Sequence, residues 1–154
     1  MKRILPDVNT LLALLDPMHV HHEAAHQWYA SQSPLRILLC PLVENGVIRV
    51  ASQPKYPNCL GTSNRVRKIL QEFAQMLNVE SCGQEVSLLD DGILLQPGLL
   101  TPLRVSDLYL LALAASNGAR FATFDTKIPA EAVTGGAGAL EIIPLSSRKT
   151  DGSA

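Results

Sequence analysis

The chain has 154 residues, of which 47% are hydrophobic and 18% charged, with a formal net charge of −1. This composition predicts one globular domain and excludes a disordered chain, and the near-neutral charge excludes a general nucleic-acid binder. We expect no signal peptide before Asp7 and no membrane span, since no apolar run approaches roughly 20 residues. Cys40, Cys59 and Cys82 lack C-x-x-C spacing, which indicates reduced thiols and a cytoplasmic protein.

The first third of the chain alternates apolar runs with helical periodicity. Pro34 and Pro41 bound one continuous apolar run, which is typical of a buried parallel strand. The patterns predict, in chain order, a strand at Ile4-Leu5, a helix over 8–15, a helix over 19–31, a strand over 35–40, and a helix from Pro41 to about Val50.

The rest of the chain repeats the alternation after a poorly patterned stretch over 78–104. Ser106 is predicted to cap a helix, and the glycine-rich segment 134–138 is predicted to be a flexible turn. The patterns predict a helix from Thr62 or Ser63 to about Leu77, a helix from Ser106 to Gly118, a strand over 119–124, a strand over 140–143, and a polar, frayed tail over 146–154. Alternating strands and helices predict a parallel sheet covered on both faces.

Four acids fall at strand carboxyl ends or helix amino ends: Asp7, Glu44, Asp107 and Asp125. In a parallel sheet these ends share one edge, so the four carboxylates are expected to converge on one cleft. Converging carboxylates take up protons or bind cations, and oxygen ligands suit Mg²⁺ or Mn²⁺. Such a site predicts metal-assisted hydrolysis of a phosphodiester, with one or two ions activating water.

Three polar residues beside these acids, Asn9, Thr123 and Ser106, are predicted to orient the carboxylates or the phosphate. Each acid alone also has an ordinary structural explanation. Asp107 suits the dipole of its helix, Glu44 suits a solvated helix face, and Asp125 suits a turn. Only their joint placement favours a site.

The same stretches resemble the PIN domains of VapC-type toxins. Asp7 lies in the opening motif Leu5-Pro6-Asp7-Val8-Asn9-Thr10, and Glu44 lies in Val43-Glu44-Asn45-Gly46-Val47. Val105-Ser106-Asp107-Leu108-Tyr109 is similar to the third acidic motif, and Phe121-Ala122-Thr123-Phe124-Asp125 is similar to the fourth. The resemblance spans residues 3 to about 145.

The resemblance implies a single PIN domain over 1–145, with a three-layer α/β/α sandwich around a five-stranded parallel sheet. It implies a Mg²⁺- or Mn²⁺-dependent endoribonuclease that acts as the toxin of a toxin–antitoxin pair and forms a homodimer. Asp7, Glu44, Asp107 and Asp125 are then the catalytic, metal-binding acids. RNA is the expected substrate, a small antitoxin protein the expected partner, and no direct DNA binding is expected.

Basic residues are the candidates for RNA backbone contacts. They are Arg49, Lys55, Arg65, Arg67, Lys68 and Arg104. His22 and His26 have i, i+4 spacing, but they lack the H-E-x-x-H arrangement, which favours a helix start near the cleft over a zinc site. Trp28 and Met76 are among the apolar residues that offer a surface to a partner chain.

Other functions stay open at this point. The first is a PIN nuclease that processes RNA without an antitoxin. The second is a receiver-like signalling domain, which also binds Mg²⁺ but requires an acid pair after its first strand. A D-x-D phosphatase requires aspartate where Asn9 stands. A catalytically dead scaffold fits poorly with four retained acids.

Overall fold

The computed structural model describes residues 1–145, which form one five-stranded parallel sheet with the order β3-β2-β1-β4-β5. The central strand β1 pairs with β2 through Ile4 and Ile37, and with β4 through Pro6 and Ala122. The strands are β1 (Lys2–Pro6), β2 (Leu35–Leu39), β3 (Glu80–Ser81), β4 (Arg120–Thr123) and β5 (Leu140–Ile142).

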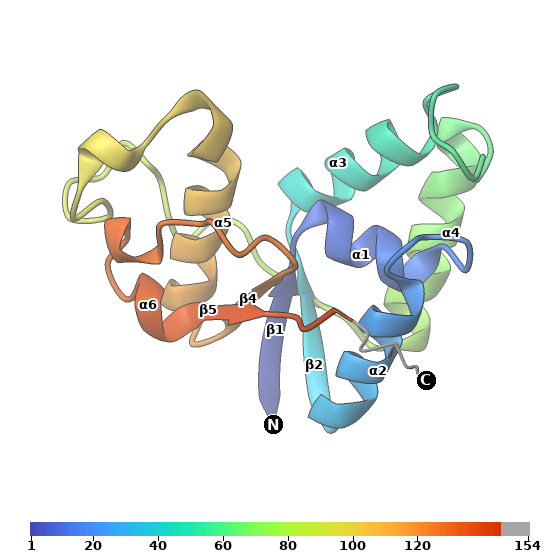
Figure 1. Ribbon diagram of the computed structural model, residues 1–154, viewed down its shortest axis with the longest axis horizontal. Coiled ribbons are helices and arrows are strands. Elements are labelled where there is room, and N and C mark those ends of the chain that lie inside the picture. Colours follow the sequence, from blue (N-terminus) through green and yellow to red (C-terminus); the bar gives the residue numbers. More distant parts are fainter. Residues whose placement is uncertain (146–154) are drawn as a thin grey trace, which may run out of the picture.

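Helices cover both faces of the sheet, so the protein is a three-layer α/β/α sandwich (Figure 1). One face carries α1 (Val8–Leu15), α2 (His22–Gln32), α3 (Pro41–Ala51) and α4 (Ser63–Met76). The other carries α5 (Val105–Ser116) and α6 (Gly136–Ala139), with short 3-10 turns at Pro97–Leu99, Pro102–Arg104 and Ala130–Ala132. The expected fold class is confirmed.

The sheet is buried on both faces, which explains its continuous apolar runs. Ile4, Leu5 and Phe121 are fully buried at its centre. Helices α1 and α3 approach closely at Gly46, where an added Cβ would lie 2.6 Å from a methyl carbon of Val8. This packing fixes the first turn of α1, which follows Asp7, against the helix that carries Glu44.

Two predicted helix starts are wrong. Helix α2 begins at His22, not at His19, because the chain first turns, with the Asp16 carboxylate accepting the Met18 N–H at 2.9 Å. Helix α5 begins at Val105 with Arg104 at the N-cap position, so Ser106 is an exposed helical residue and not a cap. The 3-10 turn that ends at Arg104 runs directly into α5 and leaves no separate capping residue.

The strand predicted at Ile4-Leu5 was too short, since β1 runs over Lys2–Pro6, and the other three predicted strands were one or two residues too long. Strand β3 was missed because an edge strand of two residues has too little pattern to detect. The glycine-rich segment is not only a turn, since it contains α6. Gly136 is buried there, and an added Cβ would lie 2.3 Å from the carbonyl oxygen of Ala130. The small residues therefore serve close packing.

Trp28 is not a partner surface, because only 4% of it is exposed and its indole N–H donates to Glu141 at 2.8 Å. Met76, in contrast, is exposed. The predicted tail, 146–154, lies outside the described residues. Within residues 1–145 no helix is long and apolar enough to cross a bilayer.

Candidate active site

Asp7 lies at the junction between the end of β1 and the start of α1. Its carboxylate caps the helix by accepting the Thr10 N–H at 2.8 Å, and its backbone N–H donates to the carbonyl of Ala122 at 3.1 Å. The second carboxylate oxygen accepts the hydroxyl of Thr123 at 2.6 Å. The parallel pairing of β1 with β4 therefore places the ends of both strands at the same point.

Thr123 also ties Asp125 to this point. Its hydroxyl oxygen accepts the Asp125 N–H at 3.1 Å, and Asp125 in turn accepts the Lys127 N–H at 2.8 Å. Thr123 is fully buried, so its hydroxyl has a fixed orientation. One buried hydroxyl thus links two of the predicted acids, which agrees with the orienting role expected for it.

Arg104 joins the third acid to this group. One guanidinium nitrogen, Nη1, donates to Asp125 Oδ2 at 2.7 Å and to Asp107 Oδ2 at 3.1 Å. Asp107 lies in the first turn of α5, one turn after Arg104. Sequence reasoning treated Arg104 as an RNA contact and missed this pairing, although the i, i+3 spacing to Asp107 was visible.

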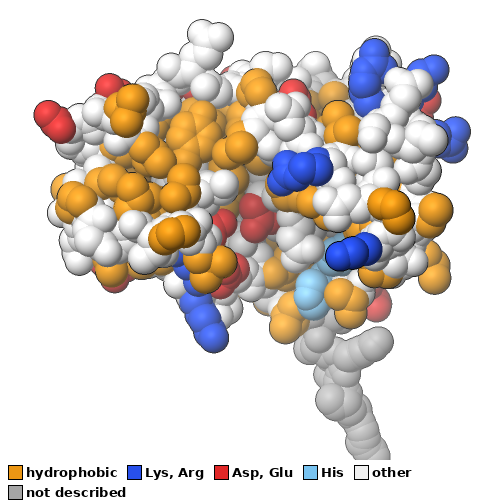
Figure 2. Space-filling model, turned by 90° about the horizontal axis from the view of Figure 1, so that it is seen from above, with side chains coloured by type: hydrophobic (Ala, Val, Ile, Leu, Met, Phe, Trp, Pro, Cys, Tyr) orange, Lys and Arg blue, Asp and Glu red, His pale blue; other side chains and the backbone are white. Residues whose placement is uncertain are grey.

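The pKa shifts of the three aspartates are consistent with their lying close together. Burial raises the pKa of Asp7, and the charge of Asp125 raises it further. Burial also raises the pKa of Asp107, and both other aspartates add to this effect. Arg104 lowers the pKa of Asp125. Figure 2 shows acidic side chains in a hollow between the two halves of this face.

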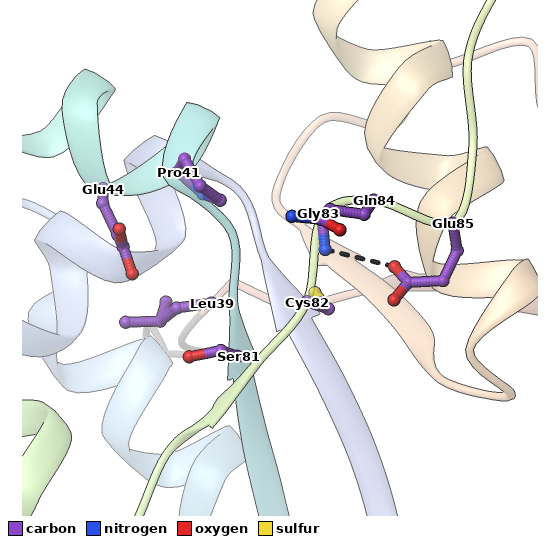
Figure 3. A pocket seen from close by; sticks show the side chains of 8 residues that line it. All are labelled: Leu39, Pro41, Glu44, Ser81, Cys82, Gly83, Gln84 and Glu85. Atoms are coloured by element: carbon purple, nitrogen blue, oxygen red, sulfur yellow. Dashed lines mark hydrogen bonds between the residues drawn. The ribbon is translucent and has the colours of Figure 1, made fainter.

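Glu44 lies farther along the same sheet edge. It projects from α3 into a pocket of about 360 Å³ beside the ends of β2 and β3, together with Leu39, Ser81 and Glu85 (Figure 3). In the described part of the chain, none of its hydrogen bonds joins it to the three aspartates. Its role as a fourth ligand stays a prediction.

The other predicted site residues divide into two groups. Asn9 is exposed beside Asp7 and contacts His19 Nε2 at 3.0 Å, and Ser106 is exposed in the first turn of α5. The predicted RNA contacts are exposed, except Arg104, whose side chain is only 14% exposed. The exposed ones are Arg49, Lys55, Arg65, Arg67 and Lys68.

The histidines are explained by helix packing. His22 Nδ1 lies 2.8 Å from the carbonyl oxygen of Ala13, and His26 Nε2 lies 2.9 Å from that of Leu14. Both rings therefore satisfy carbonyls at the carboxyl end of α1, the opposite end from Asp7. His21 stacks on Phe124, next to Asp125, with the ring centroids 4.8 Å apart.

The three aspartates fit a divalent cation by their chemistry, because hard cations prefer carboxylate oxygens. Their present arrangement is not a complete metal-binding geometry. Within residues 1–145, no three acidic, histidine or cysteine side chains are placed to hold one ion. Three oxygens of these carboxylates already accept hydrogen bonds, one from the Thr123 hydroxyl and two from Arg104.

The parallel sheet and the acids at its carboxyl edge agree with a protein family that the sequence also matches. Residues 4–132 match the PIN domain family, and the chain belongs to that family. Within the family, it is similar to VapC ribonucleases. It is 40% identical to Ribonuclease VapC44 of Mycobacterium tuberculosis over 133 residues, covering 86% of this chain and 93% of the relative.

Two further similarities agree. The chain is 34% identical to Ribonuclease VapC38 of Mycobacterium tuberculosis, covering 80% of this chain and 86% of the relative. A crystal structure of VapBC2 from Rickettsia felis bound to a DNA fragment from their promoter matches with a TM-score of 0.50 and 14% identity, over 91% of this chain and 98% of that one. This last likeness concerns the fold alone.

Proposed function

We propose that the protein is a metal-dependent endoribonuclease that hydrolyses RNA phosphodiester bonds and acts as the toxin of a toxin–antitoxin pair. The observation that carries the proposal is the coupled cluster of three aspartates at the carboxyl edge of the sheet. Ribonuclease relatives that cover most of the chain support it. PIN-domain ribonucleases in general depend on divalent metal ions, and here we infer Mg²⁺ or Mn²⁺.

Asp7, Asp107 and Asp125 would hold the ion, with Glu44 as a further ligand and one or two ions in total. A bound ion supplies an activated water and charge for the leaving oxygen. The chain itself orients the acids. The Thr10 N–H and the Thr123 hydroxyl each fix one oxygen of Asp7, so its carboxylate loses little freedom on binding. Asn9 and Ser106, exposed beside these acids, are proposed to position the phosphate.

The proposal extends to partners and place. We infer an RNA substrate, a small antitoxin protein, a homodimer and a cytoplasmic location for a single domain over residues 1–145. The relatives named VapC support the antitoxin as a partner. We do not assign DNA binding to this chain.

The test is cleavage of a total RNA pool with Mg²⁺, Mn²⁺ or EDTA by the wild type and by Asp7→Asn. Asparagine keeps the shape and the helix cap but removes the charge. We expect EDTA to abolish cleavage and the substitution to slow it about 100-fold, equivalent to ~3 kcal/mol of transition-state stabilisation. The exposed Asp91→Asn is the matched control and should cleave like the wild type.

Cleavage that survives EDTA, or equal cleavage by Asp7→Asn and wild type, would refute the metal mechanism. The toxin assignment has its own test, which is growth of cells that express the active enzyme. Normal growth despite active enzyme would favour the alternative, an RNA-processing PIN nuclease without an antitoxin.

A further inference from the structure

Arg104 places a positive charge inside the acidic cleft. Its Nη1 lies 2.7 Å from Asp125 Oδ2 and 3.1 Å from Asp107 Oδ2, so a single nitrogen bridges two acids from different elements. The Arg104 side chain is only 14% exposed, whereas the basic residues of α4 are classed as exposed. A guanidinium held in this way is an internal counter-ion and not a free surface charge.

The backbone fixes the position from which this side chain reaches. Arg104 ends a 3-10 turn that starts at Pro102, and its N–H donates to the carbonyl of Thr101 at 2.8 Å. The next residue begins α5, which also carries Asp107. The other oxygen of Asp125 is engaged by the Lys127 N–H, so Asp125 has little freedom to turn away from the arginine.

We propose that Arg104 is a built-in competitor of the divalent cation for Asp107 and Asp125. The inference rests on the proposed function, which places a metal at these acids. A cation held by Asp107 and Asp125 would be close to the guanidinium that now pairs with both acids, and the two positive groups would repel each other. Metal loading therefore has to move the guanidinium, and the affinity for metal is lower than the acids alone would give.

The test measures binding of Mn²⁺ alone, without RNA, to the purified full chain by titration calorimetry. Arg104→Gln removes the competing charge and should lower the Kd for Mn²⁺ by roughly tenfold or more, since an ion–ion contact at about 4 Å is removed. Arg104→Lys keeps the charge and should bind closer to the wild type. Arg36→Gln is the matched control, because it makes the same charge change at the amino end of β2.

An unchanged or weaker affinity of Arg104→Gln would overturn the proposal, since a merely orienting arginine would have that effect. A second measurement holds even where this variant folds poorly. In the wild type, Mg²⁺ should shift the side-chain Nε–Hε signal of Arg104 in NMR spectra and leave that of Arg36 in place. A fixed Arg104 signal, while the backbone amide of Asp125 shifts, would also overturn it.

The outcomes separate this inference from the proposed function. If neither the wild type nor Arg104→Gln binds Mn²⁺, this inference and the proposed function are both overturned. Metal-dependent RNA cleavage by a wild type whose affinity equals that of Arg104→Gln would leave the ribonuclease intact and overturn only the competition.

Discussion

The surroundings of Asp7 disfavour its charged form. Burial raises its pKa, and the Asp125 charge adds to this, while the hydrogen bonds from Thr10 and Thr123 only partly oppose it. A carboxylate that is costly to ionise in the folded protein lowers stability, but the same charge binds a cation strongly. Such a trade-off between stability and function is typical of functional sites.

The first prediction at this scale concerns stability without metal. A folded-state pKa above the unfolded value of about 3.9 means that Asp7 stabilises the fold below that pH, and that this contribution is lost as the pH rises through the folded pKa. Asp7→Asn removes the cost. We expect its free energy of unfolding at pH 7 to exceed that of the wild type by about 1 kcal/mol. Urea titrations in the presence of EDTA measure this difference.

The stability advantage of Asp7→Asn should shrink as the pH falls through the raised folded pKa of the wild-type carboxyl. Asp91→Asn, at an exposed loop position, should show no such trend. A less stable Asp7→Asn protein at neutral pH would contradict the raised pKa.

At the residue scale, the sequence predicted the acids better than their partners. Asp7 and Asp125 follow strands, and strand pairing alone brings them to one edge, so their nearness follows from topology. The bridging by Arg104 depends on the reach of a long side chain from an irregular turn, which no periodic pattern encodes. Glu44 shares the edge but, in this structure, not the hydrogen-bond network of the aspartates.

At the element scale, Asp16 connects the end of α1 to the loop between α3 and α4. It is 1% exposed and accepts the Asn58 side-chain N–H at 2.6 Å, the Tyr56 hydroxyl and the Met18 N–H. Burial alone would raise the pKa of Asp16, but these hydrogen bonds together lower it. The contact holds the loop, and with it the start of α4, against the helix that Asp7 caps.

The second prediction tests this connection. Asp16→Ala leaves the Tyr56 hydroxyl and the Asn58 amide without their acceptor, and we expect it to lower the free energy of unfolding by about 3 kcal/mol. Because the folded pKa of Asp16 is lowered, its contribution is complete above the ordinary pKa of about 3.9 and is lost as the pH falls through the folded value.

Urea titrations at pH 7 and pH 3 check both parts, with a smaller gap to the wild type at pH 3. Asp91→Ala is the control and should stay within about 0.5 kcal/mol of the wild type at both values. An equally small loss for Asp16→Ala would mean that the loop is held by other contacts.

Element boundaries show where sequence patterns stop being informative. Helix α4 was predicted within a residue or two at both ends, because Thr62 is an N-cap whose side chain accepts the Arg65 N–H. Helix α5 has no capping side chain at Arg104, so the preceding 3-10 turn could not be separated from it by pattern. The stretch that follows β3 is mostly irregular chain, which carries no period, and its Leu95 N–H donates to the carbonyl of Ala132 at 2.8 Å.

At the scale of the whole molecule, the cleft holds acidic side chains, and basic side chains lie beside it. Figure 2 shows Lys and Arg side chains around the half that carries α3 and α4, beside the hollow with the acids. Glu44 and Arg67 line one pocket between these two helices. Arg67 of α4 therefore lies next to a predicted catalytic acid, which offers RNA phosphates a path towards that acid despite the net charge of −1.

The last prediction concerns this path. In the Asp7→Asn background, with EDTA present so that the RNA stays uncut, joint substitution of Arg65, Arg67 and Lys68 by Gln should weaken RNA binding. It should also make the dependence of log K on log salt shallower by about 2, because fewer counterions are released. Fluorescence anisotropy with a single-stranded RNA at several salt concentrations measures both. Arg36→Gln, at the amino end of β2, should leave the slope unchanged. An unchanged slope in the triple variant would mean that the RNA backbone approaches the acids from the α5 side, where Arg104 is the basic residue nearest to them.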